Sequence, residues 1–158
     1  MGKVLSIFIC SKENEPMQEV QSVRALGGIG LEGDRYAEKN GTFSDSDENK
    51  EKEKPRHVTL ISMEDIKAAN SEILDQPFKP QETRRNIVVE GIDVGRLVNR
   101  RFRVGDVLME GIEPCEPCSL PSKLSGKPDF KRVFRARAGL RAAIIINGTI
   151  SVGDEVVG

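Results

Sequence analysis

Residues 139–156 read GLRAAIIINGTISVGDEV, and they decide the fold prediction. Two β-rich runs, Ala143–Ile146 and Thr149–Val152, are separated only by Asn147-Gly148. Both residues of that pair tolerate the positive φ of a type I′ turn, so the sequence predicts a two-residue β-hairpin. The Val-Gly-Asp triplet that follows also occurs at Val104-Gly105-Asp106. Glycine permits a tight turn and aspartate bonds nearby backbone, so we expect two matching corners of a β-barrel.

Most of the remaining chain also shows short apolar or alternating runs bounded by turn residues, which is typical of strands. The further strand candidates are Val4–Ile9, Glu19–Ala25, His57–Ile61, Ile87–Val89 and Val104–Met109. The pattern therefore predicts a mainly β (α+β) fold.

One helix is predicted from Met63 to about Leu74. Ser62 can cap its first turn, with Asp65 three residues on, and apolar residues recur on one face at helical spacing. A second segment, Phe130–Ala138, could be a short helix or a strand. The sequence thus predicts a barrel with a few short helices.

The chain has 158 residues, of which 37% are hydrophobic, and its net charge is −1. This length favours a single domain over 1–158. Ser44–Arg56 contains no apolar residue, so the sequence predicts a mobile polar surface loop at about 40–56 within that domain. Met1–Cys10 is apolar over too short a stretch to span a bilayer and lacks a cleavage pattern. We expect a cytoplasmic protein without a membrane segment.

The chain has one histidine, His57, and three cysteines, Cys10, Cys115 and Cys118. These counts exclude a multi-histidine metal site and a four-cysteine zinc site. A Ser-His-Asp triad would have to use His57, which opens a predicted strand. A disulfide-stapled secreted scaffold is disfavoured, because three cysteines are few and odd in number.

Charge is distributed unevenly along the chain. Residues 84–141 carry 13 basic and 7 acidic groups, whereas residues 1–83 carry 11 basic and 16 acidic groups. A basic second half suits an anionic ligand such as a phosphate, and a solvated surface is the alternative. The net charge of −1, the single tyrosine and the lack of tryptophan disfavour nucleic acid as a partner.

Cys115-Glu116-Pro117-Cys118 is the first candidate for chemistry. Such a motif can be a redox pair, half of a metal site, or a loop with one working thiol. The flanking prolines indicate a loop among strands, which argues against a thioredoxin-like motif. Seven basic residues and one acidic residue follow in 121–141. Nearby cations favour a thiolate, whereas a buried structural cysteine is the alternative.

Three further segments place charged residues at turns. Asp34 and Arg35 close the glycine-rich run that begins at Gly28, which matches neither a dinucleotide fingerprint nor a phosphate-binding loop. Arg84 and Arg85 precede Asn86 and a strand, where they could clamp a phosphate or carboxylate. Arg141 lies in the turn that leads into the last strands.

Together these segments resemble the MOSC family, named for the C-terminal domain of molybdenum-cofactor sulfurases. The matching stretches, in order, are GIGLEGDRYA, HVTLIS, RRNIVVEGI, FRVGDVLMEGIEPCEPC and GLRAAIIINGTISVGDEV. The resemblance spans nearly the whole chain and implies a small MOSC-like β-barrel with a few short helices.

The resemblance also implies a function. Family members are thought to bind molybdenum cofactor or carry sulfur for it, and some reduce N-hydroxylated compounds. Carried onto this sequence, the functional cysteine is Cys118, as a thiolate that ligates molybdenum or holds a persulfide. The cofactor-binding residues implied, or expected from their charge and place, are Asp34, Arg35, Arg84, Arg85, Asn86, Cys115 and Arg141.

One part of the family pattern is missing. Many relatives have a His-Gly-Gly stretch where this chain has the polar run Ser44–Arg56. Reductase activity would therefore need a rebuilt substrate side and a separate redox protein, and a sulfur carrier would need a separate sulfur donor. The alternative is a non-catalytic adaptor that binds an anion or pterin phosphate.

Overall fold

The structure is a computed structural model, and it describes residues 1–38, 55–73 and 75–158. The strands in these ranges are β1 (Gly2–Ile9), β2 (Gln18–Val20), β3 (Ser22–Leu26), β4 (Gly30–Leu31), β5 (Val58–Ser62), β6 (Ile87–Glu90), β7 (Arg101–Val104), β8 (Val107–Pro114), β9 (Leu140–Ile146), β10 (Gly148–Ser151) and β11 (Glu155–Val157). The helices are α1 (Met63–Asn70), α2 (Leu120–Ser125) and α3 (Phe130–Val133), with 3-10 turns η1 (Pro80–Thr83) and η2 (Val94–Leu97).

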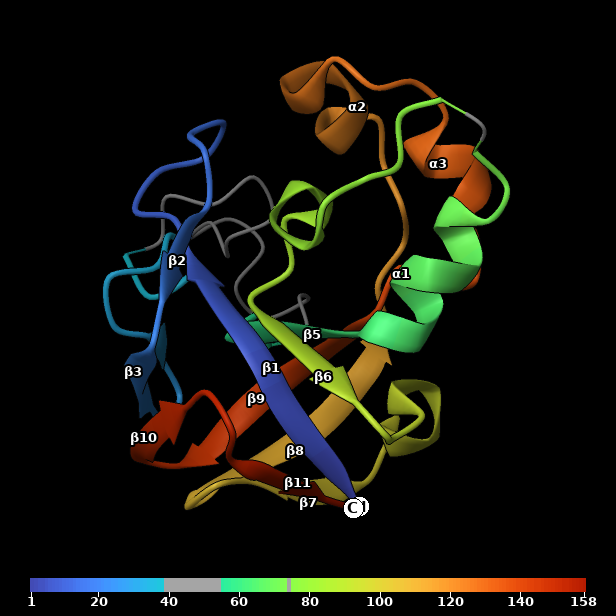
Figure 1. Ribbon diagram of the computed structural model, residues 1–158. Coiled ribbons are helices and arrows are strands. Elements are labelled where there is room, and N and C mark those ends of the chain that lie inside the picture. Colours follow the sequence, from blue (N-terminus) through green and yellow to red (C-terminus); the bar gives the residue numbers. More distant parts are fainter. Residues whose placement is uncertain (39–54, 74) are drawn as a thin grey trace.

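Seven of the described strands form a closed barrel. Their order is β11-β7-β8-β9-β5-β6-β1, and β1 pairs with β11 to close the ring. The closing register places Gly2 opposite Val156, so the two ends of the chain lie together (Figure 1). β2 adds to the outer edge of β1, and β10, β3 and β4 form a separate small sheet. The prediction of a mainly β barrel with a few short helices is confirmed.

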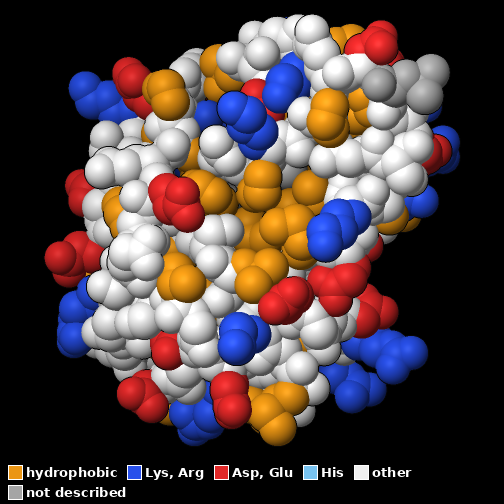
Figure 2. All heavy atoms as spheres, in the orientation of Figure 1, with side chains coloured by type: hydrophobic (Ala, Val, Ile, Leu, Met, Phe, Trp, Pro, Cys, Tyr) orange, Lys and Arg blue, Asp and Glu red, His pale blue; other side chains and the backbone are white. Residues whose placement is uncertain are grey.

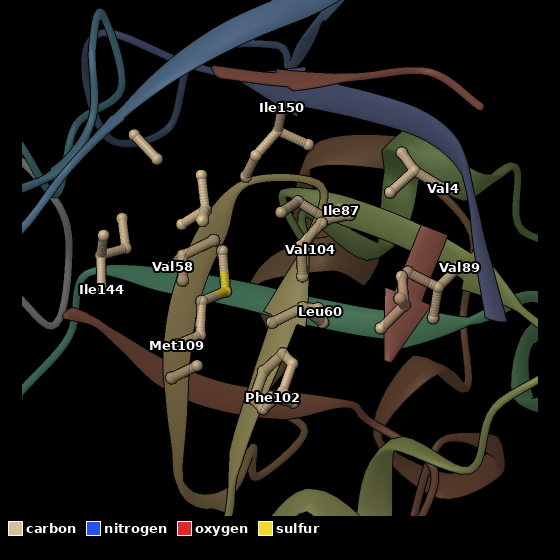
Figure 3. Close-up of a cluster of buried hydrophobic side chains, with 14 of the residues drawn as sticks. Val4, Val58, Leu60, Ile87, Val89, Phe102, Val104, Met109, Ile144 and Ile150 are labelled. Carbon is tan, nitrogen blue, oxygen red and sulfur yellow. The ribbon is translucent and has the colours of Figure 1, made fainter. Parts of the chain in front are cut away.

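The two faces of the barrel wall follow from the two-residue period of a strand. In β5, Val58 and Leu60 belong to the buried cluster inside the barrel, whereas Ile61 belongs to a second cluster outside it. Figure 3 shows the inner cluster, where Leu60, Phe102 and Met109 approach one another from different strands. Thr59 alternates with these inward residues and therefore lies on the outer face of the wall.

The outer cluster is covered by helices. α1 and α3 lie on the same side of the barrel (Figure 1). Phe130 and Phe134 stack at 4.4 Å between ring centroids, and Phe78 meets both rings edge-on. Figure 2 shows hydrophobic side chains gathered in the middle of the face between β1 and α1, with charged side chains around them. The barrel thus has an apolar layer on its outside as well as a core.

The two Val-Gly-Asp triplets form neighbouring corners, as predicted. Gly105 (φ +57°) turns the chain from β7 into β8, and Gly153 (φ +95°) turns it from β10 into β11. The Gly105 N–H donates to the Glu155 carbonyl at 2.9 Å, which joins the two corners. The predicted strand Val104–Met109 is wrong in its bounds, because this turn divides it between β7 and β8.

The hairpin predicted at Asn147-Gly148 is wrong. β10 does not pair back on β9 but with β3, with Ile150 opposite Val23. Neither residue of the predicted turn has positive φ. The Asn147 side-chain oxygen instead accepts the Gly27 N–H, so the chain continues extended from the barrel into the small sheet.

Further boundaries also differ from the predictions: Arg141, expected in a turn, lies in β9, which begins at Leu140. Glu19–Ala25 divides into β2 and β3, which belong to different sheets. The helix that Ser62 caps ends at Asn70, where the Asn70 side chain bonds the Phe78 backbone in both directions. The ambiguous segment Phe130–Ala138 contains the short helix α3.

The Cys115–Cys118 motif lies in an irregular segment between β8 and α2, as predicted. Residues 120–125 form α2, in which Pro121 occupies the first turn, a position that needs no N–H donor. Most of the predicted loop at 40–56 lies outside the described residues. None of the helices in the described ranges combines the length and the apolarity needed to cross a membrane.

Candidate functional site

A row of polar side chains crosses the outer face of the barrel wall. Arg141 in β9 lies opposite Glu113 on β8 and opposite Thr59 on β5. Because directly paired residues point to the same face of a sheet, the three side chains lie side by side. Asn86 extends the row onto the start of β6, where its Oδ1 accepts the Thr59 N–H at 3.0 Å.

This row borders a cavity of about 250 Å³. The described residues around it come from the end of β8, the start of β9, the middle of β5 and the segments at 36, 56 and 85. They are Tyr36, Arg56, Thr59, Arg85, Glu113, Pro114, Cys115, Glu116 and Arg141. The cavity therefore combines one thiol with three guanidinium groups and two carboxylates.

A glycine just before β9 and a register shift in β8 shape this wall. Gly139 has φ +101°, and a Cβ there would lie 2.3 Å from the Leu60 carbonyl oxygen. Its own carbonyl accepts the Cys115 N–H at 2.8 Å, which fixes the backbone of the first cysteine. The β8–β9 register shifts between Gly111 and Glu113, and the shifted pairing sets Glu113 opposite Arg141.

Arg85 and Arg141 are held differently in the cavity wall. Arg85 Nε donates to the Ala138 carbonyl at 2.6 Å, and its two terminal nitrogens have no partner among the described residues. Arg141 Nη2 pairs with Glu113 Oε1 at 2.6 Å, and its side chain is only 12% exposed. Arg141 Nε is buried without an acceptor in the described part of the chain. Both groups keep hydrogen-bonding capacity that an anion can use.

The cysteines of the motif occupy different positions. Cys115 lines the cavity, and burial raises the pKa of its thiol, while Arg85 and Arg141 act in the opposite direction. Glu113 and Glu116 add to the increase in this pKa. Cys118 is partly exposed, immediately before the N-terminus of α2, and is absent from the described lining of the cavity. The assignment of the working thiolate to Cys118 stays a prediction.

Asp34 organises a buried network behind the cavity. Its side chain has no exposed surface and lies 3.2 Å from the Arg35 guanidinium. Asp34 also accepts the Cys10 N–H at 3.0 Å, the Tyr36 N–H at 3.3 Å and the Asn86 amide at 3.2 Å. Burial raises the pKa of Asp34, and these donors oppose the increase.

Arg84 and Arg35 belong to the same support. Arg84 adopts φ +63° and donates to the Glu15 carbonyl, while its own carbonyl accepts Arg35 Nη2 at 3.3 Å. The Arg35 guanidinium also lies 4.5 Å from the centre of the Tyr36 ring. Of the predicted cofactor-binding residues, Arg85, Cys115 and Arg141 line the cavity. Asp34, Arg35, Arg84 and Asn86 hold its wall in place.

Sequence reasoning missed several residues of this cavity. Thr59, Glu113 and Glu116 lie inside quoted motifs, but they received no role. Tyr36 directly follows the Asp34-Arg35 turn. Thr59 and Glu113 could have been found only through their strand pairing with Arg141, and the sequence does not show which strands are neighbours. His57, given no catalytic role, accepts the Ile144 N–H at Nδ1.

The cavity lies on a fold that has known counterparts. A sequence model of the MOSC domain matches residues 44–157, which is most of the chain. The chain belongs to the MOSC domain family. The predicted resemblance is therefore confirmed. No curated protein matches the sequence.

Solved structures share this MOSC fold at low sequence identity. YuaD from Bacillus subtilis has a TM-score of 0.79 and 16% identity, and the match covers 99% of this chain and 94% of that one. YiiM from Geobacillus stearothermophilus has a TM-score of 0.70 and 13% identity, over 99% of this chain and 74% of that one. YiiM from Escherichia coli has a TM-score of 0.67 and 17% identity, over 99% and 70%. At identities this low, the structural similarity shows the fold alone, and the ligand has to be inferred from the residues of the cavity.

MOSC domains are associated with the molybdenum cofactor, so the family bears on the ligand. Within the described ranges, no three His, Cys, Asp or Glu side chains gather closely enough to hold a metal ion by themselves. What the cavity offers is a thiol beside cationic hydrogen-bond donors.

Proposed function

We propose that this cavity binds molybdenum cofactor, or holds sulfur destined for it, with a cysteine of the Cys115–Cys118 motif as the sulfur ligand. The observation that carries the proposal is the cavity itself. In a MOSC fold, it brings the thiol of Cys115 together with Arg85 and Arg141. A phosphate-bearing cofactor needs fixed cationic donors, and molybdenum or a persulfide needs a sulfur atom.

The residues present fit such a cofactor. Arg85 and Arg141 would hold its phosphate, since both retain donors that are unused within the described chain. Among the described residues the buried Arg141 Nε–H has no acceptor, a state that costs free energy unless an oxygen satisfies it. When bound, the cofactor would supply a redox-active metal that a thiolate can ligate. Tyr36 and Thr59 would complete the wall around it.

The two thiols have different parts in the proposal. Cys118 is the proposed molybdenum ligand or persulfide carrier, by its match to the family motif. Its partial exposure before α2 leaves it accessible to a sulfur-donor or redox protein. Cys115 lies in the wall beside the two arginines and would contact the bound group. Reduction of N-hydroxylated compounds would need electrons from a separate protein.

The test uses protein purified from a host that makes the cofactor. Molybdenum is measured by elemental analysis, pterin by fluorescence after oxidation, and persulfide by mass spectrometry of cysteine peptides. We expect wild type to retain at least one of these groups and Cys118→Ser to lose the metal and the persulfide. Cys10→Ser is the control thiol, because Cys10 is not among the described residues that line the cavity and its thiol donates to the Lys12 carbonyl. Equal retention in wild type and Cys118→Ser, or none in either, would contradict the role of Cys118.

A second candidate function is a non-catalytic adaptor that binds the pterin phosphate or a similar anion. One observation favours it: burial raises the pKa of Cys115, so the cavity thiol tends to stay neutral, and a neutral thiol is a poor metal ligand. This function predicts that Arg85→Gln and Arg141→Gln weaken phosphate binding, whereas Cys118→Ser leaves it unchanged. Intact affinity in the arginine variants would refute it.

A further inference from the structure

The Glu113 carboxylate pairs with Arg141, a largely buried cation of the cavity. Glu113 Oε1 lies 2.6 Å from Arg141 Nη2, and the two residues are direct partners on β8 and β9. The Glu113 side chain is 37% exposed, against 12% for Arg141. The carboxylate therefore lies nearer the solvent than the cation, on the same face of the wall.

An anion that reaches Arg141 from the cavity meets this carboxylate. It must either share the guanidinium with Glu113 or displace it, and in both cases it approaches a like charge. Glu116 adds a second carboxylate to the lining, while Arg85 and Arg56 contribute positive charge. A dianion meets about twice the repulsion from Glu113 that a singly charged anion meets.

We propose that Glu113 is a specificity-determining residue that competes with the ligand for Arg141 and so weakens the binding of dianions more than that of singly charged anions. This inference rests on the proposed function only in taking the ligand to carry a phosphate group. It differs from a structural role, in which Glu113 would serve to hold Arg141 ready for the ligand. The two roles predict opposite effects of removing the charge.

The experiment measures the binding of inorganic phosphate, phenyl phosphate and acetate to the purified full chain by calorimetry at neutral pH. In Glu113→Gln the amide oxygen can still accept from Arg141, while the negative charge is gone. We expect phosphate and phenyl phosphate to bind about three- to tenfold more tightly than to wild type, as for loss of one partly exposed charge. Phosphate should gain more than acetate, because the charge that is removed repels a dianion more strongly than a monoanion.

A matched control and a second measurement separate the explanations. Glu110→Gln changes a carboxylate of the same strand that pairs with the exposed Arg101 at 3.7 Å, away from the cavity. This variant should leave the affinities for phosphate, phenyl phosphate and acetate unchanged. The alkylation rate of Cys115, followed on its own peptide, should increase in Glu113→Gln, because Glu113 disfavours the thiolate.

Several results would overturn the proposal. Weaker or unchanged phosphate binding in Glu113→Gln would refute competition and indicate a positioning role, and so would the absence of binding in that variant. Equal gains for phosphate and acetate would refute selection by charge. The test does not use molybdenum or pterin, so it can succeed even if the purified protein retains no cofactor, in which case only the proposed function fails.

Discussion

Replacing Asp34 by alanine tests the idea that a buried ionic network supports the cavity. Asp34 has no exposed surface, and its partner Arg35 is 4% exposed. The substitution removes the carboxylate oxygen that lies 3.2 Å from the Arg35 guanidinium. It also removes the acceptor used by the Cys10 and Tyr36 N–H groups and by the Asn86 amide.

The size of the effect follows from what is left behind. Removing one partner of a buried ion pair leaves an uncompensated charge and costs about 3–5 kcal/mol. Each buried donor without an acceptor costs about 1–3 kcal/mol more, but water entering the space left by the carboxylate offsets part of this. We therefore expect Asp34→Ala to lower the free energy of unfolding by about 3–5 kcal/mol, a large share of the roughly 5–15 kcal/mol typical of a domain.

The assay is urea unfolding followed by circular dichroism, with wild type and Glu110→Ala measured beside Asp34→Ala. Glu110 pairs with Arg101 at the surface, so its loss should cost under about 1 kcal/mol. Asp34→Asn keeps an oxygen for the Cys10 N–H but loses the charge, and it should fall between the two. A loss in Asp34→Ala no larger than in Glu110→Ala would refute the view that this network supports the wall.

Three other outcomes are expected. Gly139→Ala should destabilise the protein by several kcal/mol in urea unfolding, because the added Cβ would lie 2.3 Å from the Leu60 carbonyl oxygen and the backbone φ is +101°. A change under about 1 kcal/mol would contradict this expectation. Phe130→Ala should cost about 3–5 kcal/mol in the same assay, since its ring is fully buried against Phe134, and a loss near zero would show that the helical layer is dispensable. The alkylation rate of Cys115 should begin to rise at higher pH in the native protein than in the unfolded chain, because burial raises the pKa of this thiol. The free energy of unfolding should fall as pH passes the ordinary thiol pKa, where the thiol of the unfolded chain loses its proton first. Coincident alkylation profiles for the native and unfolded protein would contradict the raised pKa.

Local sequence signals predicted the barrel and its corners well. The two Val-Gly-Asp turns needed only glycine conformation and a neighbouring aspartate, both properties of the residues themselves. Asn147-Gly148 failed as a hairpin for a non-local reason. The Gly27 N–H, 120 positions away, bonds the Asn147 side chain and turns the next strand toward β3.

The site was predicted less completely, because it depends on strand order. Cys115, Arg85 and Arg141 could be selected by their charge or chemistry. Thr59 and Glu113 could not, since each reaches the cavity only as a pairing partner of Arg141. Asp34 and Arg35 were expected at the ligand; both are buried, they pair with each other, and neither is among the described residues that line the cavity.

The pairing of β1 with β11, which closes the barrel, constrains the order in which the strands can assemble during folding. β1 pairs with β11 at Gly2 and Val156, almost the full length of the chain apart. During synthesis β1 must wait, with part of one edge unpaired, until β11 has left the ribosome. Contacts this distant in sequence also slow folding, because the longest loop must close before they form. Loss of the three residues of β11 would therefore expose two strand edges at once, on β1 and on β7.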